Sequence, residues 1–191
     1  MKKIILTAIL ATVLIGCKKE AEKKEAEKTE ENISATDSAN IQSTPESETS
    51  KISLKEVDQK GLTEILSKNN DTLYVTNFFA TWCGPCMMEM PHFKKKIEEL
   101  KGQPVKFTFI NIFNKPDWQT EVSAFAQTSG LADKILLLDD SKLNQDFFEN
   151  FQQWSGNNIP FTFFRKGDKT EESLGSMSEE MLNSKIDSFL K

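Results

Sequence analysis

The sequence has few of the side chains that most often build metal centres and anion sites. Its 191 residues include one histidine (His92), one arginine (Arg165) and three cysteines. A zinc site needs four ligands, so His92 together with two cysteines falls short, and we predict no metal. Peroxidase chemistry is also disfavoured, since it requires a cysteine in another loop context with an arginine partner, and Arg165 is the only arginine.

A basic cluster is missing as well. Lysine and arginine total 24 against 29 acidic residues, which gives a formal net charge of -5. Nucleic-acid binding relies on lysine and arginine contacts to phosphates, so we predict no nucleic-acid partner.

No apolar run is long enough to span a membrane. The run Ile4–Ile15 has twelve residues, whereas a span needs ~20. Lys2 and Lys3 precede it and a small residue, Gly16, follows it, which is typical of a signal peptide. We therefore predict that residues 1–16 are a signal peptide.

The residue after this peptide is a cysteine. Residues 14–17 read LIGC and resemble the lipobox of bacterial lipoproteins, whose cysteine is acylated and becomes the new N-terminus. We predict that Cys17 is lipidated and holds the protein at a membrane of the bacterial cell envelope, on its extracytoplasmic (periplasmic) side. An ordinary signal peptide with an incidental Cys17 is the alternative.

Aromatic residues are absent from the next segment. Residues 17–51 are rich in Lys, Glu, Ser and Thr, and every Phe and Trp lies beyond them. Such a composition cannot bury enough apolar surface to offset chain entropy. We predict that 17–51 is a disordered charged tether, that 52–191 is the only folded domain, and that the protein is a monomer.

The periodicity of residues 52–191 alternates between strands and helices, which predicts an α/β fold with a central mixed sheet flanked by helices. The expected strands are 52–57, 72–80, 105–113, 135–138, 161–165 and 170–174. The expected helices are 61–68, 84–101, 118–128, 143–154 and 178–190. In the last helix we expect Ser178 as N-cap and Met181, Leu182, Ile186 and Phe189 facing inward.

Two cysteines stand where the strand 72–80 meets the next helix. Cys83 and Cys86 are separated by two residues, and a Cys-x-x-Cys beside a βαβ pattern is typical of redox chemistry. Cys83 would begin the helix, where unpaired N–H groups and the macrodipole favour an anion. A thiol at such a position can have its pKa lowered from ~8.5 to ~3.5–7.5. We predict that Cys83 is the nucleophile and Cys86 the resolving residue, with their disulfide as the only redox group.

The surrounding motif resembles the thioredoxin family. Residues 77–86 read NFFATWCGPC, Pro91 follows, and Ile159-Pro160 precedes a strand hairpin. The run Glu89-Met90-Pro91 is similar to the membrane-anchored thiol–disulfide oxidoreductases of the TlpA/ResA type. The resemblance implies a thioredoxin fold with a helix–strand–helix insertion before a cis-proline, Pro160. It also implies a substrate-binding surface built from Trp82, Gly84, Pro85, Ile159 and Pro160.

One departure from the family concerns proton transfer. Cytoplasmic thioredoxins carry a buried Asp in the active-site strand and a Lys in the next strand, where this sequence has Asn77 and Phe109 or a neighbour. Asn77 cannot accept a proton. Glu89 lies one helical turn after Cys86 on the same face, so it is the candidate base. The alternative is that Glu89 is an exposed helix carboxylate.

Three functions remain open. The first is a thiol–disulfide oxidoreductase that reduces extracytoplasmic proteins, with cytochrome c maturation as one pathway. Its partners would be protein clients with disulfides or dithiols, a membrane or extracytoplasmic electron donor, and the membrane itself through Cys17. The second is a non-catalytic thioredoxin-fold lipoprotein. The third is a copper-delivery protein, suggested by Met87, Met88 and Met90.

Overall fold

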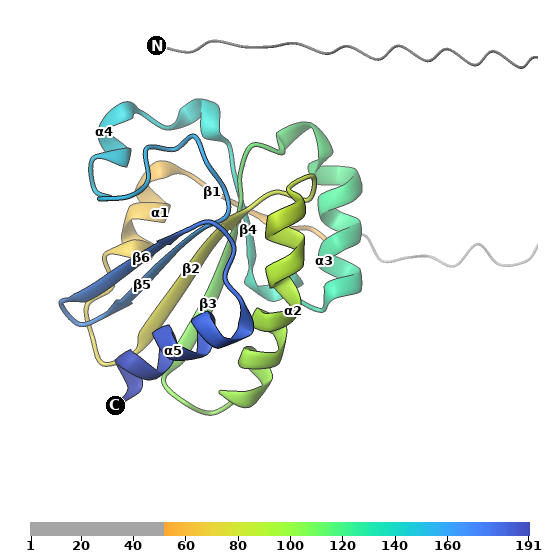
Figure 1. Cartoon of the computed structure of the whole chain (residues 1–191). Helices are drawn as coiled ribbons and strands as arrows, with labels where there is room; N and C mark the ends of the chain where they lie inside the picture. The colour runs from red at the N-terminus through yellow and green to blue at the C-terminus, as the bar shows by residue number, and fades with distance from the viewer. Residues whose placement is uncertain (1–51) are drawn as a thin grey trace, which may run out of the picture. The chain divides into compact units, whose positions relative to one another are not determined.

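The computed structural model describes residues 52–191, which form a mixed six-stranded sheet with helices on both faces (Figure 1). The predicted signal peptide, the lipidation site at Cys17 and the tether lie outside the described residues and stay predictions. Among residues 52–191, no helix is both long and apolar enough to cross a membrane.

The strand order is β1–β4–β3–β2–β5–β6. The first four strands in this order run parallel, and β5 is antiparallel to both β2 and β6. The strands are β1 (Lys55–Val57), β2 (Leu73–Phe79), β3 (Val105–Asn111), β4 (Ile135–Leu138), β5 (Phe161–Lys166) and β6 (Lys169–Leu174). The α/β fold with a mixed sheet is confirmed, and β1 is shorter than the predicted strand 52–57.

The central strand β2 carries the chain to the cysteines. All seven of its residues are buried, because β3 and β5 flank it and helices cover both faces. A nearly continuous apolar and β-branched sequence suits such a doubly covered strand. The strand ends at Phe79, four residues before Cys83, so the sheet fixes the position of the cysteine pair.

Two helical layers sandwich the sheet. The helices are α1 (Gln59–Leu66), α2 (Gly84–Glu99), α3 (Ser123–Ser129), α4 (Gln145–Phe148) and α5 (Glu179–Leu190). Short 3-10 turns cover Lys115–Asp117, Ala132–Lys134 and Asp140–Lys142, and a π-helical turn covers Trp118–Val122. Buried residues of α2, α3 and α5 share one apolar cluster, and buried residues of α1 and α4 belong to another on the opposite face.

The last helix begins as predicted. The Ser178 hydroxyl accepts a hydrogen bond from Met181 N at 3.2 Å, which satisfies one of the free N–H groups of the first turn. Leu182, Ile186 and Phe189 are buried in the core. The prediction for Met181 is wrong, because its side chain lies in the first turn on the outer side of α5 and is 48% exposed.

The predicted helix 143–154 is also wrong beyond its first turn. Only Gln145–Phe148 is α-helical, and the backbone N–H groups of Gln152 and Gln153 donate to the Glu172 carboxylate at 2.7–3.1 Å. These bonds to β6 replace helical ones. The aromatic spacing that suggested a helix instead reflects packing onto the sheet, since the Trp154 ring stacks on Phe161 with centroids 4.6 Å apart.

The insertion between β3 and β5 therefore contains a π-helical turn with α3, the strand β4 and the short helix α4. The helix–strand–helix prediction holds, although the first helix starts with a π turn and the second has one turn. Phe147, Phe151 and Trp154 still bury the insertion against β2 and β5.

Candidate active site

The cysteine pair lies where the carboxyl end of β2 meets the amino end of α2. Cys83 is the N-cap of α2, and its Sγ accepts a hydrogen bond from Cys86 N at 3.2 Å. Pro85 stands within the first turn, where its missing N–H leaves no hydrogen bond unmade. The geometry predicted for Cys83 at a helix N-terminus is therefore present, and the same N–H would face a Cys83 thiolate after reduction.

The two cysteines form a disulfide, and their Cα atoms are 5.2 Å apart. They differ in exposure. Cys83 retains 4% of its surface, whereas Cys86 is fully buried. Only Cys83 is therefore within reach of another protein, which agrees with its prediction as the first nucleophile.

Pro160 faces this disulfide across the site. The Ile159–Pro160 peptide bond is cis, as the family resemblance implied. The carbonyl oxygen of Ile159 lies 3.8 Å from Cys83 Sγ. Pro160 is buried and Ile159 is half-buried, so the backbone just before Pro160 borders the attacking sulfur.

Exposed apolar surface surrounds Cys83. Trp82 is 59% exposed, and Gly84 and Pro85 are exposed beside it. The Trp82 indole N–H donates to the Phe113 carbonyl at 3.0 Å. Phe113 adopts a positive φ of 59°, which side chains with a Cβ rarely adopt. The loop after β3 therefore holds the indole ring in place at the edge of the site.

Glu89 is inside the protein rather than on the helix surface. Its side chain is 1% exposed, and both carboxylate oxygens have partners. Asn77 Nδ2 donates to Oε1 at 2.8 Å and Met177 N donates to Oε2 at 2.9 Å. Burial raises the pKa of Glu89 to about 7, although the hydrogen bonds from Met177 and Asn77 lower it. The alternative of an exposed carboxylate is thereby wrong.

Asn77 links Glu89 to the strand that follows Pro160. The two Nδ2 protons go to Glu89 and to Thr162 Oγ1, the latter at 2.9 Å. Its Oδ1 is buried and has no hydrogen-bond partner among residues 52–191. Phe109 sits beside Asn77 in β3, so no lysine stands in that register position. Asn77 acts as a donor to Glu89 and not as a base.

A second polar network supports the loop between β2 and α2. Asn114 Oδ1 accepts hydrogen bonds from Thr81 N and Thr81 Oγ1, both at 2.8 Å. Asn114 Nδ2 in turn donates to Asp117 at 2.9 Å. Asn114 is 1% exposed. Sequence reasoning missed it, and the only available signal was a polar residue directly after an apolar strand.

The other candidate metal-binding side chains do not lie close together. His92 is half-buried, with Nδ1 3.1 Å from the Met177 carbonyl oxygen. Met90 is buried in the core, whereas Met88 is 66% exposed. Among residues 52–191, no group of three or more His, Cys, Asp or Glu side chains is arranged to hold a metal ion.

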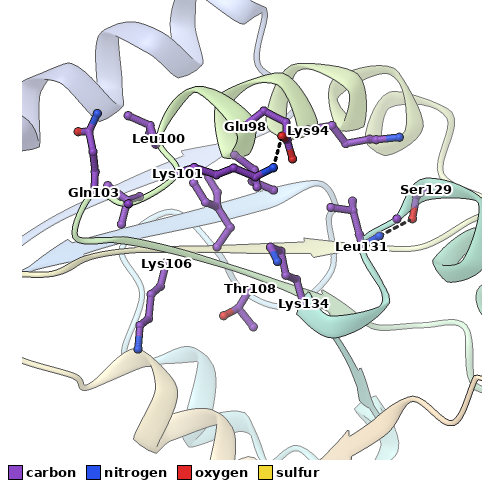
Figure 2. A pocket seen from close by; sticks show the side chains of 15 residues that line it. Lys94, Glu98, Leu100, Lys101, Gln103, Lys106, Thr108, Ser129, Leu131 and Lys134 are labelled. Atoms are coloured by element: carbon purple, nitrogen blue, oxygen red, sulfur yellow. Dashed lines mark hydrogen bonds and ion pairs between the residues drawn. The ribbon is translucent and has the colours of Figure 1, made fainter.

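One hollow among residues 52–191 lies away from the cysteines. It has a volume of about 550 Å³ and is lined by the last turns of α2, the start of β3 and the end of α3. Figure 2 shows Lys94, Lys101 and Lys134 around it, with Lys101 paired to Glu98. Lys134 pairs with Asp133, so two of these three lysines have carboxylate partners.

Comparisons with known proteins agree with this geometry. The thioredoxin family model matches residues 53–129. The thiol-disulfide oxidoreductase ResA of Geobacillus kaustophilus is 28% identical over 135 residues, which are 69% of this chain and 71% of that protein. Thioredoxin of Mycoplasma pneumoniae is 32% identical over 77 residues, which are 40% of this chain and 68% of that protein.

A solved structure shares the fold. A thiol:disulfide interchange protein of the thioredoxin family from Chlorobium tepidum superposes with a TM-score of 0.55 at 19% identity, covering 72% of this chain and 93% of that one.

Proposed function

Because the chain belongs to the thioredoxin family and is a thiol–disulfide oxidoreductase, we propose that it reduces disulfides of extracytoplasmic proteins. The observation that carries this proposal is the setting of Cys83. Its sulfur receives the Cys86 N–H at the start of α2 and lies 3.8 Å from the Ile159 carbonyl oxygen, inside a rim of exposed apolar residues.

The reaction starts from the reduced pair. The Cys83 thiolate attacks one sulfur of the client disulfide, forms a mixed disulfide and expels the other client sulfur as a thiolate, which takes up a proton. An extended client segment would lie against Trp82, Gly84 and Pro85 on one side and against Ile159 and Pro160 on the other. Such a segment would pair with the backbone of Ile159.

Resolution requires Cys86 to lose a proton. Its thiolate attacks Cys83 Sγ, which forms the Cys83–Cys86 disulfide and releases the second client thiol. Two electrons pass from the dithiol to the client. We propose that Glu89 accepts the Cys86 proton, because both are buried and lie three residues apart on one face of α2. A pKa of about 7 is suited to a base at neutral pH.

The place and partners of the protein are part of the same proposal. A lipidated Cys17 would hold the domain on the outer side of a bacterial membrane, in the cell envelope. The oxidised domain would be reduced again by a membrane or extracytoplasmic dithiol donor. We propose apocytochrome c with an oxidised haem-binding pair as one client class, in line with the pathway expected from the sequence resemblance.

The test combines a measurement of the reduction potential of the cysteine pair with the trapping of mixed disulfides. We expect the Cys83–Cys86 pair to have a reduction potential of about -270 mV, which is typical of a reductant. A value of about -120 mV is typical of an oxidant. Cys86→Ser should accumulate mixed disulfides through Cys83 when extracytoplasmic proteins are offered, and Cys83→Ser is the matched control that should trap none. An oxidising potential together with trapped reduced clients would contradict the reductase direction.

The two alternatives from the sequence predict other results. A non-catalytic lipoprotein would leave insulin disulfides intact in the presence of dithiothreitol. A copper-delivery protein would bind copper tightly when reduced, and Met88→Ala with Met90→Ala would abolish that binding. We expect insulin reduction that depends on Cys83 and is unchanged by Met88→Ala.

A further inference from the structure

The turn that joins β2 to α2 is held by the loop that follows β3. Within the turn, Cys83 N donates to the Ala80 carbonyl at 3.2 Å. Trp82 is 59% exposed, so burial of its ring restrains the backbone little, and its indole N–H donates to the Phe113 carbonyl at 3.0 Å. The position of Cys83 relative to the sheet therefore depends on contacts with the loop after β3.

Asn114 makes the central contact of that loop. Its side chain is 1% exposed, and its Oδ1 accepts both the backbone N–H and the hydroxyl of Thr81 at 2.8 Å. Asn111 Nδ2 donates to the same oxygen at 3.4 Å, and Asn114 Nδ2 donates to Asp117 Oδ2 at 2.9 Å. The amide oxygen thus faces three donors while the amide nitrogen faces a carboxylate, which fixes the orientation of the Asn114 side chain.

Thr81 lies two residues before Cys83, the N-cap residue of α2. Cys83 has an extended backbone with φ -82° and ψ 100°, and in this conformation its sulfur accepts the Cys86 N–H at 3.2 Å. The rest of α2 is anchored in the core through buried side chains such as Met90 and Phe93. A displaced Thr81 would therefore change the backbone torsions of Cys83 and turn its sulfur away from the helix N-terminus, where free N–H groups stabilise a thiolate.

We propose that Asn114 is a positioning residue for Cys83. Its amide oxygen satisfies two donors of Thr81 that would otherwise lose their acceptor, and Thr81 in turn fixes the backbone that brings the Cys83 sulfur to the first turn of α2. Asn114 is buried and acts on Cys83 only through this backbone. It thereby sets the fraction of Cys83 that is thiolate in the reduced protein, and with it the rate of the first attack.

The proposal does not depend on the direction of disulfide exchange or on the base for Cys86. It concerns only the reactivity of the Cys83 sulfur, which takes part in exchange whether the domain reduces or oxidises its clients. Glu89 has its own partners, Asn77 and Met177, and Asn114 contacts none of them through its printed set of donors and acceptors on Thr81, Asn111 and Asp117.

The direct test is the pH dependence of Cys83 alkylation. We would treat the reduced full-length protein with iodoacetamide from pH 5 to 9 and follow the peptide that carries Cys83 by mass spectrometry. Asn114→Ala should raise the measured pKa of Cys83 by about 1 unit, which lowers the thiolate fraction about tenfold at pH values below the pKa. Because a more basic thiolate is a better nucleophile, alkylation there should slow only about threefold.

Two further variants exchange the groups at positions 114 and 117. Asn114→Asp keeps an acceptor for Thr81 but places two carboxylates in contact, so it should also raise the pKa of Cys83. Asn114→Asp combined with Asp117→Asn restores the hydrogen bond with donor and acceptor reversed and leaves the net charge as in the wild type. This double variant should recover at least half of the shift. Asp117→Asn alone still offers Asn114 an amide oxygen and should leave the profile unchanged.

Asn144 provides a matched control elsewhere in the domain. Its Oδ1 accepts Phe147 N at 3.0 Å and Gln59 Nε2 at 3.1 Å at the start of α4. Asn144→Ala therefore removes a comparable set of hydrogen bonds and should lower the stability of the fold, while the pKa of Cys83 stays at its wild-type value.

A wild-type pH profile in Asn114→Ala would overturn the proposal. If that variant does not fold, a wild-type profile in Asn114→Asp would overturn it, as would a double variant that recovers none of the shift. A shift of equal size in Asn144→Ala would overturn it too, because the change would then reflect a general loss of stability.

Discussion

Two buried carboxylates of this domain behave in opposite ways. Glu89 on α2 is 1% exposed and Asp139 after β4 is 5% exposed. Burial raises the pKa of Glu89 to about 7. Hydrogen bonds from Lys115 and then from Ser141 lower the pKa of Asp139 to about 2. Similar exposure therefore leads to a group that titrates near neutrality in one place and to a permanent anion in the other.

The opposite pKa shifts of Glu89 and Asp139 follow from the groups that contact each carboxylate. Asp139 Oδ2 is 2.5 Å from the ammonium of Lys115, and Oδ1 accepts the Ser141 hydroxyl at 2.6 Å. Glu89 has only the neutral donors Asn77 and Met177 N. A cation stabilises the ionised form strongly, whereas neutral donors compensate only part of the desolvation. The carboxylate beside the cysteine pair can therefore exchange protons, and the one near β1 holds a loop.

The largest effect is expected from Glu89→Gln. This variant should slow resolution by Cys86 about 100-fold, as expected for loss of a general base, while the first attack by Cys83 stays nearly intact. Single-turnover kinetics with a client disulfide from pH 6 to 8 would separate the two steps. Asp139→Asn, with the same change at the other carboxylate, should leave both rates unchanged. A wild-type resolution rate in Glu89→Gln would show that water accepts the proton.

The free energy of unfolding should fall as pH rises, because of the protonation of Glu89. Because its folded-state pKa of about 7 exceeds the ordinary 4.5, the folded state binds the proton more tightly. The contribution is complete below pH 4.5 and is lost as pH rises through 7. The pKa difference converts to about 3 kcal/mol of unfolding free energy. Urea unfolding of the oxidised protein between pH 5 and 8 should show this fall, and Glu89→Gln should flatten it. An equally steep fall in the variant would assign it to another group.

Asn77→Asp would increase the difference between the surroundings of Glu89 and those of Asp139. A second carboxyl would replace the amide that donates to Glu89 at 2.8 Å, and two adjacent carboxylates cannot both ionise easily. We expect the pair to hold one proton at pH 7 and the pH profile of resolution to move up by about 1 unit. Thr162→Val removes the other contact of Asn77 without adding charge, and its profile should stay in place. An unmoved profile in Asn77→Asp would mean that Glu89 does not titrate during resolution.

The smallest effect is expected at Asp139. Its pKa is lowered from 3.8 to about 2, so its stabilising contribution is present above pH 3.8 and is lost as pH falls through 2. Asp139→Asn should be less stable than the wild type at pH 7, and the difference should shrink on acidification. Acid titration followed by circular dichroism would measure it. A difference that stays constant down to pH 2 would exclude the Lys115 pair as its cause.

The sequence predicted most of what local patterns encode. The β2 strand, the start of α2, the N-cap Ser178 and the position of Cys83 were all found, because apolar runs, caps and the Cys-x-x-Cys spacing are short-range signals. Glu89 was found from its spacing to Cys86 alone. Its burial could not be predicted, since the partner Met177 N lies 88 residues away in sequence.

The wrong and missed predictions from the sequence share one cause. The aromatic residues of 147–154 repeat at helical spacing, yet the Glu172 carboxylate accepts the backbone N–H groups of Gln152 and Gln153, which replaces the helical hydrogen bonds there. Asn114 supports Thr81 across 33 residues. Contacts of this kind are long-range tertiary contacts, and the periodicity of residues along the sequence does not predict them.

The left-handed Phe113 has a consequence for the proposed contact with client proteins. A positive φ costs a residue with a Cβ about 1–2 kcal/mol, and here it accompanies a carbonyl that holds the Trp82 indole. That hydrogen bond contains no titratable group. The recognition surface should thus keep its shape over the pH range in which Glu89 gains and loses its proton, so client affinity and proton transfer can vary independently.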